Sequence, residues 1–337
     1  MKRFSFILAI LLMINLLSAQ SQLDNLIAEG IKYHDKQEYF KAIDIYKQAL
    51  EIDPNSLIAN YEIALSYMYA EDYYKSIEHA NKVIGKKSEY ESLAYIIKGS
   101  CLDYIGKTEE AIKLFKSAIK KNKNEHLLYY NLGLTYYNAE YYDKAEEALT
   151  SAIYIMPTHA SSHLLLGYLM SDRHERIKSI LCFHFFLFLE PNSDRSPEAY
   201  SLLRSQFAGN VKKDTLDPNT INIVVNTEDT EKEFFGIETM LSMLEATKDN
   251  AENANKTDEV IFKENSTKFF KMLGEKMSKN KKGLWWNFYI PFFNYIANSD
   301  YMETYCYYIS SSQEKAQQWF KENPTKLDEF YDWINSD

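Results

Sequence analysis

Small and apolar residues recur at fixed intervals between positions 23 and 193. One column of glycine or alanine has intervals of 34, 35, 34 and 34 residues: Gly30, Ala64, Gly99, Gly133 and Gly167. Twelve residues after each comes a second small residue: Ala42, Ser76, Ala111, Ala145 and Ser179. A mostly larger column follows four residues later: Tyr46, Ala80, Phe115, Leu149 and Phe183. A period of this length is typical of repeat proteins in which each unit is one supersecondary element.

The columns predict two antiparallel helices in each unit. Small residues where two helices cross let the backbones approach closely, and the column of larger residues fills the space between them. Pro54, Pro157 and Pro191 end the first, fourth and fifth units, because proline has no N–H to continue a helix. The predicted units are 23–56, 57–90, 92–125, 126–159 and 160–193.

These columns resemble the tetratricopeptide-repeat (TPR) family through all five units. The departures are Ser88 and Lys123 in place of the proline, and the bulky Phe186 in the last unit. The resemblance implies an all-α, right-handed superhelical solenoid. It also implies that the first helices line a concave groove that receives peptides or partner helices, so the expected function is non-enzymatic protein binding.

The residues that would face such a groove follow from the spacing i, i+4, i+7 along each first helix. The predicted protein-binding residues are Tyr61, Leu65, Met68, Tyr69, Tyr104, Tyr130, Leu134, Tyr137 and Tyr168. They include no Lys or Arg. Family members that capture a chaperone's C-terminal carboxylate use these residues to bind the anion. An aromatic, weakly acidic groove suits an apolar or amphipathic segment of a partner protein. The alternative is that these tyrosines pack against the chain's own C-terminal domain or thicken the core.

The second helix of the fifth unit predicts a covered surface, because residues 180–189 are apolar nearly all round. The region 194–337 is therefore expected to form a helical C-terminal domain that closes the solenoid. Helices are predicted at 197–208, 229–247, 257–279, 284–298, 300–322 and 324–335, with a polar loop at 248–258. Residues 221–225 could form a short strand, for which no partner strand is evident. The tail is similar to tails that follow TPR arrays in secreted proteins of Gram-negative bacteria, a resemblance that implies no activity.

The first residues have the pattern of a cleavable signal peptide, predicted at 1–19. Lys2 and Arg3 precede an apolar run that is too short to span a bilayer, and Ser18 and Ala19 follow it. The first cysteine is Cys101, so no lipid-anchored cysteine follows the cleavage point. The pattern predicts a periplasmic or secreted protein of the bacterial cell envelope.

Charge and cysteine content narrow the possible partners. The net charge is −10 and no stripe of basic residues is visible. Nucleic acid is therefore not an expected partner, because binding its phosphates requires clustered cations. The three cysteines, Cys101, Cys182 and Cys306, form no CxxC pair and are expected to be buried thiols. One disulfide remains open, because the predicted compartment permits it.

No residue pattern predicts a catalytic site, a cofactor or a metal. His159 and His163 are four residues apart and could share one helical face, but no third ligand is near in sequence, so surface positions are expected. No HExxH, GxSxG or phosphate-binding glycine loop is present.

The segment 284–296 is the densest aromatic stretch of the chain. An alternative function uses Trp285 and Trp286 as stacking platforms for a glycan or another small ligand. Contact with a membrane surface is not favoured, because the lysines at 279, 281 and 282 form no helical stripe.

Overall fold

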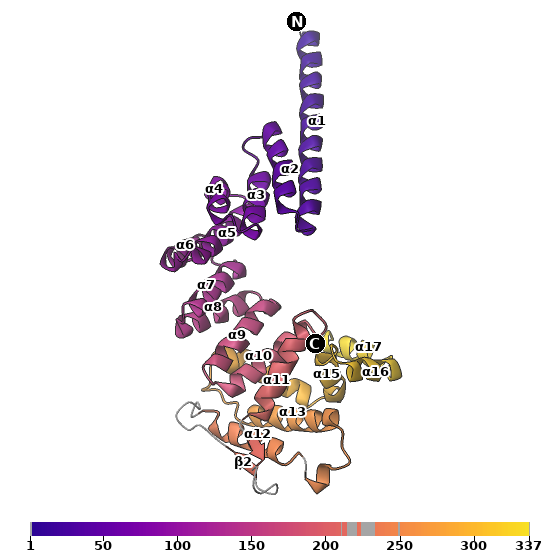
Figure 1. The fold of residues 1–337 in the computed structure, drawn as a ribbon. Coiled ribbons are helices and arrows are strands. Elements are labelled where there is room, and N and C mark those ends of the chain that lie inside the picture. Colours follow the sequence, from indigo (N-terminus) through magenta and orange to yellow (C-terminus); the bar gives the residue numbers. More distant parts are fainter. Residues whose placement is uncertain (1, 210, 214–220, 224–232, 249, 337) are drawn as a thin grey trace. The chain divides into compact units, whose positions relative to one another are not determined.

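The computed structural model describes residues 2–209, 211–213, 221–223, 233–248 and 250–336 (Figure 1). The chain forms two compact units, Met1–Ile155 and Met156–Asp337. The fifth predicted repeat therefore lies in the same unit as the C-terminal helices. Within the described residues, no helix combines the length and the apolar character needed to cross a membrane.

The first unit consists of four helical hairpins, as the columns predict. Its helices are α1 (Lys2–Asp35), α2 (Tyr39–Ile52), α3 (Leu57–Tyr69), α4 (Tyr73–Val83), α5 (Tyr90–Tyr104), α6 (Thr108–Lys121), α7 (His126–Asn138) and α8 (Tyr142–Ile155). Each first helix contacts its own second helix, and α1, α3 and α5 also contact the first helix of the next hairpin. The first helices α1, α3, α5 and α7 thus lie in one row.

The small-residue column has the predicted packing role. A Cβ on Gly30 would lie 2.2 Å from a ring carbon of Tyr46, and one on Gly99 would lie 2.2 Å from a ring carbon of Phe115. Both rings are fully buried. Only glycine leaves room there for an aromatic ring from the second helix.

Every hairpin turn uses the same repeat position in the left-handed region. These residues have φ of 63°, 60°, 78°, 60° and 58°, in the order Gln37, Glu71, Gly106, Glu140 and His174. The N–H of the next residue donates to a carbonyl five positions back, as from Glu38 to Tyr33. This bond closes the first helix in the manner of a Schellman motif. Only one of the five turns uses glycine, so composition alone did not mark them.

The second unit contains the fifth hairpin and the C-terminal helices. Its α-helices are α9 (Ala160–Asp172), α10 (Arg176–Leu189), α11 (Ser196–Ala208), α12 (Phe235–Ala246), α13 (Asp258–Glu275), α14 (Ile290–Ala297), α15 (Met302–Ile309), α16 (Glu314–Glu322) and α17 (Lys326–Ile334). A 3₁₀ turn (Ala251–Asn253) precedes α13, and a π-helical turn (Trp285–Tyr289) leads into α14. The part of the expected helix at 229–232 lies outside the described residues.

Two short strands interrupt the otherwise helical second unit. β1 (Val211–Lys213) pairs antiparallel with β2 (Ile221–Ile223), and Val211 lies opposite Ile223. The predicted strand at 221–225 therefore has a partner that sequence reasoning missed, while residues 224 and 225 lie outside the described part. The all-α fold class is otherwise confirmed.

Helix α10 lies at the centre of the second unit. Every residue from Arg176 to Leu187 is buried. Helices α9, α11, α12 and α15 and the π-helical turn all contact it. The prediction that a covering domain docks on residues 180–189 is confirmed.

A buried arginine joins α10 to two of these helices. Arg176 donates to the main-chain oxygens of Gln206 and Phe207, each at 2.6 Å, and to the Ser242 hydroxyl at 2.7 Å. The two carbonyls end α11, where a cation is favoured by the helix dipole. The fifth repeat is thereby tied to α11 and α12 through one side chain.

Candidate functional site

In the first unit, the predicted binding positions fall on the row of first helices. We call their surface the first-helix face. It comprises Ile27, Ile31, His34, Asp35, Tyr61, Glu62, Leu65, Met68, Tyr69, Ile96, Ser100, Asp103 and Tyr104, and continues on α7 with Tyr130, Leu134 and Tyr137.

Helix α3 shows how the face is divided between core and surface. Tyr61, Leu65 and Met68 are half-buried and pack against a core cluster that includes Ala64. Tyr69, at the end of the helix, keeps 55% of its surface exposed. The face is therefore a partly solvated aromatic surface that rests on the core of the repeats.

Two tyrosine pairs, one stacked and one tilted, build the most exposed part of the face. The Tyr69 ring lies 5.7 Å from that of Tyr39 at 21°, and the Tyr104 ring lies 5.2 Å from that of Tyr73 at 38°. In each pair, the last residue of a first helix meets the first residue of the preceding hairpin's second helix. Tyr104 is 61% exposed. Sequence reasoning missed Tyr39 and Tyr73, although both occupy the same repeat position.

On α7, the predicted residues Tyr130, Leu134 and Tyr137 are half-buried. The Tyr137 ring lies 6.2 Å from that of Tyr142 in the same hairpin. Tyr168 belongs to the second unit, where its half-buried ring meets Phe183 edge-on at 5.7 Å.

The titratable groups of the face are acidic or neutral. The pKa of His34 is lowered mainly by burial, so this ring is uncharged at pH 7, and its Nδ1 lies 2.9 Å from the Ser66 hydroxyl. The pKa of Glu62 is raised mainly by burial. Asp103 accepts a hydrogen bond from Thr108 at 2.7 Å.

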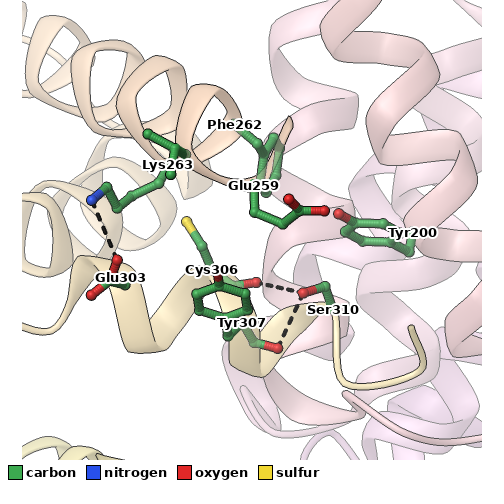
Figure 2. A pocket seen from close by; sticks show the side chains of 9 residues that line it. Tyr200, Glu259, Phe262, Lys263, Glu303, Cys306, Tyr307 and Ser310 are labelled. Atoms are coloured by element: carbon green, nitrogen blue, oxygen red, sulfur yellow. Dashed lines mark hydrogen bonds and ion pairs between the residues drawn. The ribbon is translucent and has the colours of Figure 1, made fainter. Parts of the chain in front are cut away.

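The second unit contains a small pocket between α11, α13 and α15 (Figure 2). Its empty space is about 300 Å³, including open solvent, and its wall includes Tyr200, Glu259, Cys306 and Tyr307. Glu259 pairs with Lys315 at 2.8 Å.

The other charged side chains and the thiol of this pocket are poorly suited to catalysis. Figure 2 shows Lys263 and Glu303 turned toward each other, 3.5 Å apart. Burial raises the pKa of Cys306 far above its ordinary value, which keeps the thiol protonated and a poor nucleophile. The arrangement therefore does not favour catalysis.

The predicted stacking platform of the C-terminal aromatics is wrong for this structure. Trp285 and Trp286 are only 9% and 7% exposed. Trp285 stacks on Tyr289 at 5.3 Å, and Trp286 stacks on Phe234 at 5.4 Å. The Trp286 ring joins the π-helical turn to the start of α12, and neither buried ring is available to a sugar.

The expectation that His159 and His163 are surface residues is wrong for His163, which is fully buried. Its two ring nitrogens lie 2.6 Å from the Tyr289 hydroxyl and 2.8 Å from the Pro157 oxygen. The half-buried His159 lies 2.8 Å from the Ser162 hydroxyl. Among the described residues, no group of three or more His, Cys, Asp or Glu side chains could hold a metal ion. All three cysteines are buried, and none of them forms a disulfide.

Family models for the tetratricopeptide repeat match residues 33–56, 93–124 and 126–159. These segments fall in the first, third and fourth hairpins. The chain therefore carries tetratricopeptide repeats. Such repeats are in general non-catalytic and support a role in protein–protein interaction.

Two curated relatives match part of the chain. A TPR repeat-containing protein of Methanocaldococcus jannaschii, MJ1428, is 29% identical over 141 residues, which is 40% of this chain. The BBSome complex member BBS4 of Bos taurus is 24% identical over 129 residues, which is 38% of this chain. The chain spans about a quarter (24%) of the length of each relative.

Solved TPR structures are also similar. TTC0263 of Thermus thermophilus, a thermophilic TPR protein, has a TM-score of 0.49 and 19% identity, over 54% of this chain and 100% of its own. MamA has a TM-score of 0.40 and 28% identity, over 48% and 94%. YrrB, described as a TPR protein with an unusual peptide-binding site, has a TM-score of 0.39 and 18% identity, over 53% and 91%.

Proposed function

We propose that this chain is a non-enzymatic scaffold or adaptor of the bacterial cell envelope that holds a segment of a partner protein on its first-helix face. The observation that carries the proposal is the exposure of Tyr69 and Tyr104, at 55% and 61%, beside half-buried apolar residues of the same face. Tyrosine offers a large stacking area and a hydroxyl for a partner's backbone, and contiguous exposed aromatic surface marks interaction sites.

The envelope location rests on the sequence of the N-terminal segment. Lys2, Arg3 and the apolar run that follows them have the composition of a signal peptide, so we propose cleavage after residue 19 and a periplasmic or secreted product. Cell fractionation with an antibody against the C-terminal helices tests this location. Recovery of the full-length chain in the cytoplasm would contradict it.

The partner is proposed to be a protein. The net charge of −10 disfavours nucleic acid, because phosphate binding requires clustered cations. No role in the proposed function is assigned to a cofactor or a metal. The glycan alternative loses its support, because Trp285 and Trp286 are buried.

A paired substitution tests the first-helix face. Tyr69→Ala combined with Tyr104→Ala removes two exposed rings, whereas Tyr130 and Tyr137 are half-buried and their loss would also disturb packing. We expect the variant to lose a partner that the unaltered chain captures from an envelope extract.

The matched control is Tyr74→Ala combined with Tyr154→Ala. These tyrosines are 72% and 52% exposed, but they lie on the second helices α4 and α8. The control should retain the partner. If the variant without Tyr69 and Tyr104 still captured the partner and the control variant did not, binding would be assigned to the surface of the second helices.

A further inference from the structure

Glu62 lies in the first-helix face among three tyrosines. The hydroxyl of the buried Tyr46 donates to its carboxylate at 3.4 Å. The neighbouring Tyr61 ring lies 5.4 Å from that of Tyr90. Burial is the main reason that the pKa values of Tyr61 and Tyr90 are raised. The Glu62 charge adds to both shifts, although at Tyr90 the charge and the hydrogen bond of Glu89 contribute more.

This carboxylate has no cation of its own. Among the described residues, no Lys or Arg forms an ion pair with Glu62, and its side-chain hydrogen bond comes from Tyr46. Glu62 is half-buried, and burial is the main reason that its pKa is raised. A carboxylate that has lost part of its hydration without gaining a counter-charge is held at a free-energy cost.

The surroundings of Glu62 reinforce the negative potential. Asp35, at the end of α1, further raises the pKa of Glu62. The residues of the face on α1, α3 and α5 include Asp35, Glu62 and Asp103 but no Lys or Arg. A complementary ligand must therefore bring positive charge to an aromatic surface.

We propose that Glu62, Tyr61 and Tyr90 form a subsite for a single cationic side chain, lysine or arginine, in the partner segment; this inference rests on the proposed function of the face. The cation pairs with the Glu62 carboxylate and lies against the tyrosine rings, where aromatic faces attract cations. Its methylene stem covers half-buried apolar surface of the same face. The partner segment is thus apolar with one fixed positive charge.

A peptide library tests the subsite directly. Random peptides displayed on phage are selected on the full chain and, in parallel, on the variants Glu62→Gln and Glu62→Lys. We expect the unaltered chain to enrich Lys or Arg at one position beside apolar residues. Glu62→Gln should lose that enrichment, and Glu62→Lys should enrich Asp or Glu there. Glutamine retains an acceptor for the Tyr46 hydroxyl, and circular dichroism checks that the variants fold.

The affinity of one selected peptide, synthesised with an acetylated N-terminus, gives the magnitude. Glu62→Gln should weaken binding roughly 5- to 30-fold. The lower value is expected if the charges stay exposed to solvent, and the upper value if they lose their water on binding. Replacing the peptide's cation by norleucine should weaken it similarly, and the two changes together should cost little more than either alone. Glu78→Gln, at an exposed carboxylate of α4, is the matched control and should leave affinity unchanged.

The outcomes separate this inference from the proposed function. Selection of purely apolar peptides whose binding depends on Tyr69 and Tyr104 would overturn the cationic subsite and leave the face as the binding surface. Cationic peptides that bind equally well to Glu62→Gln would also overturn it. If no peptide bound the unaltered chain, both the subsite and the proposed face would be contradicted.

Discussion

The Nδ1 atom of His163 lies 2.6 Å from the hydroxyl oxygen of Tyr289, which is 126 residues later in the chain. The other ring nitrogen, Nε2, lies 2.8 Å from the Pro157 carbonyl oxygen, which can only accept a hydrogen bond. Nε2 therefore carries the proton, and Nδ1 accepts from the tyrosine. This bond joins the first helix of the fifth repeat to the aromatic segment of the C-terminal helices.

Removing this hydroxyl should destabilise the second unit. Tyr289→Phe leaves the Nδ1 atom of the buried His163 without its donor, which costs about 1–3 kcal/mol of unfolding free energy. Urea unfolding followed by tryptophan fluorescence measures the change. Tyr307→Phe is the matched control, because no described residue hydrogen-bonds to that hydroxyl. An equal effect of the two substitutions would contradict the importance of the bond.

Acidification should destabilise the same unit. Burial lowers the pKa of His163 to about 4 and that of His184 to about 3. In the unfolded chain both should titrate near 6.5, so between these values the unfolded state binds more protons and stability falls as pH decreases. At pH 5 each histidine should cost about 2 kcal/mol relative to neutral pH.

The pH effect can be assigned to one residue. His184→Gln is expected to be less stable at pH 7, because the Nδ1 atom lies 2.9 Å from the Tyr305 hydroxyl in a fully buried site. It should nevertheless lose about 2 kcal/mol less than the unaltered chain between pH 7 and pH 5. His174→Gln, at an exposed position, serves as the control. Parallel pH profiles for the unaltered chain and His184→Gln would contradict the assignment.

The repeats should be intolerant of added volume at the glycine column. In Gly99→Ala the new Cβ would lie 2.2 Å from the buried Phe115 ring, so we expect a loss of about 1–3 kcal/mol. Gly236→Ala adds the same atom to α12, where nothing lies within 4 Å, and should be neutral or stabilising. Thermal unfolding of both variants distinguishes a packing role of the column from a general effect of alanine.

The C-terminal helices should be required for the solubility of the fifth repeat. Truncation after Ser193 removes Tyr289 and Tyr305, which hydrogen-bond to α9 and α10, and uncovers apolar residues of α10 such as Phe185 and Phe186. We expect the fragment to aggregate during size-exclusion chromatography. A stable, monomeric fragment would show that α10 does not need this cover.

The helical hairpins were predictable because their determinants are local. The spacing of Gly30, Gly99 and their partner rings is set by the geometry of one hairpin, and the apolar character of α10 indicated that other elements cover it. The ring contacts of the exposed Tyr69 and Tyr104 with Tyr39 and Tyr73 also follow from a repeat position, once the neighbouring hairpin is considered.

Two of the misses depend on contacts between distant segments. His163 is buried because Tyr289 reaches it from 126 residues away, and Trp286 is covered by Phe234. The three-residue strand at 211–213 carries too little pattern to be recognised without its partner. The partial burial of Glu62 was missed because a carboxylate on a helix is usually solvated, and only the fold brings the Tyr46 hydroxyl to it.

The most direct test of the account is site-specific photo-crosslinking in the cell that makes the protein. A benzophenone side chain in place of Tyr69 lies on the first-helix face, and the same group in place of Tyr74 lies on the second helix of the same hairpin. Both positions are exposed, at 55% and 72%. We predict a discrete protein adduct from position 69 and none from position 74. An adduct from position 74 alone would contradict the claim that the first helices hold the partner.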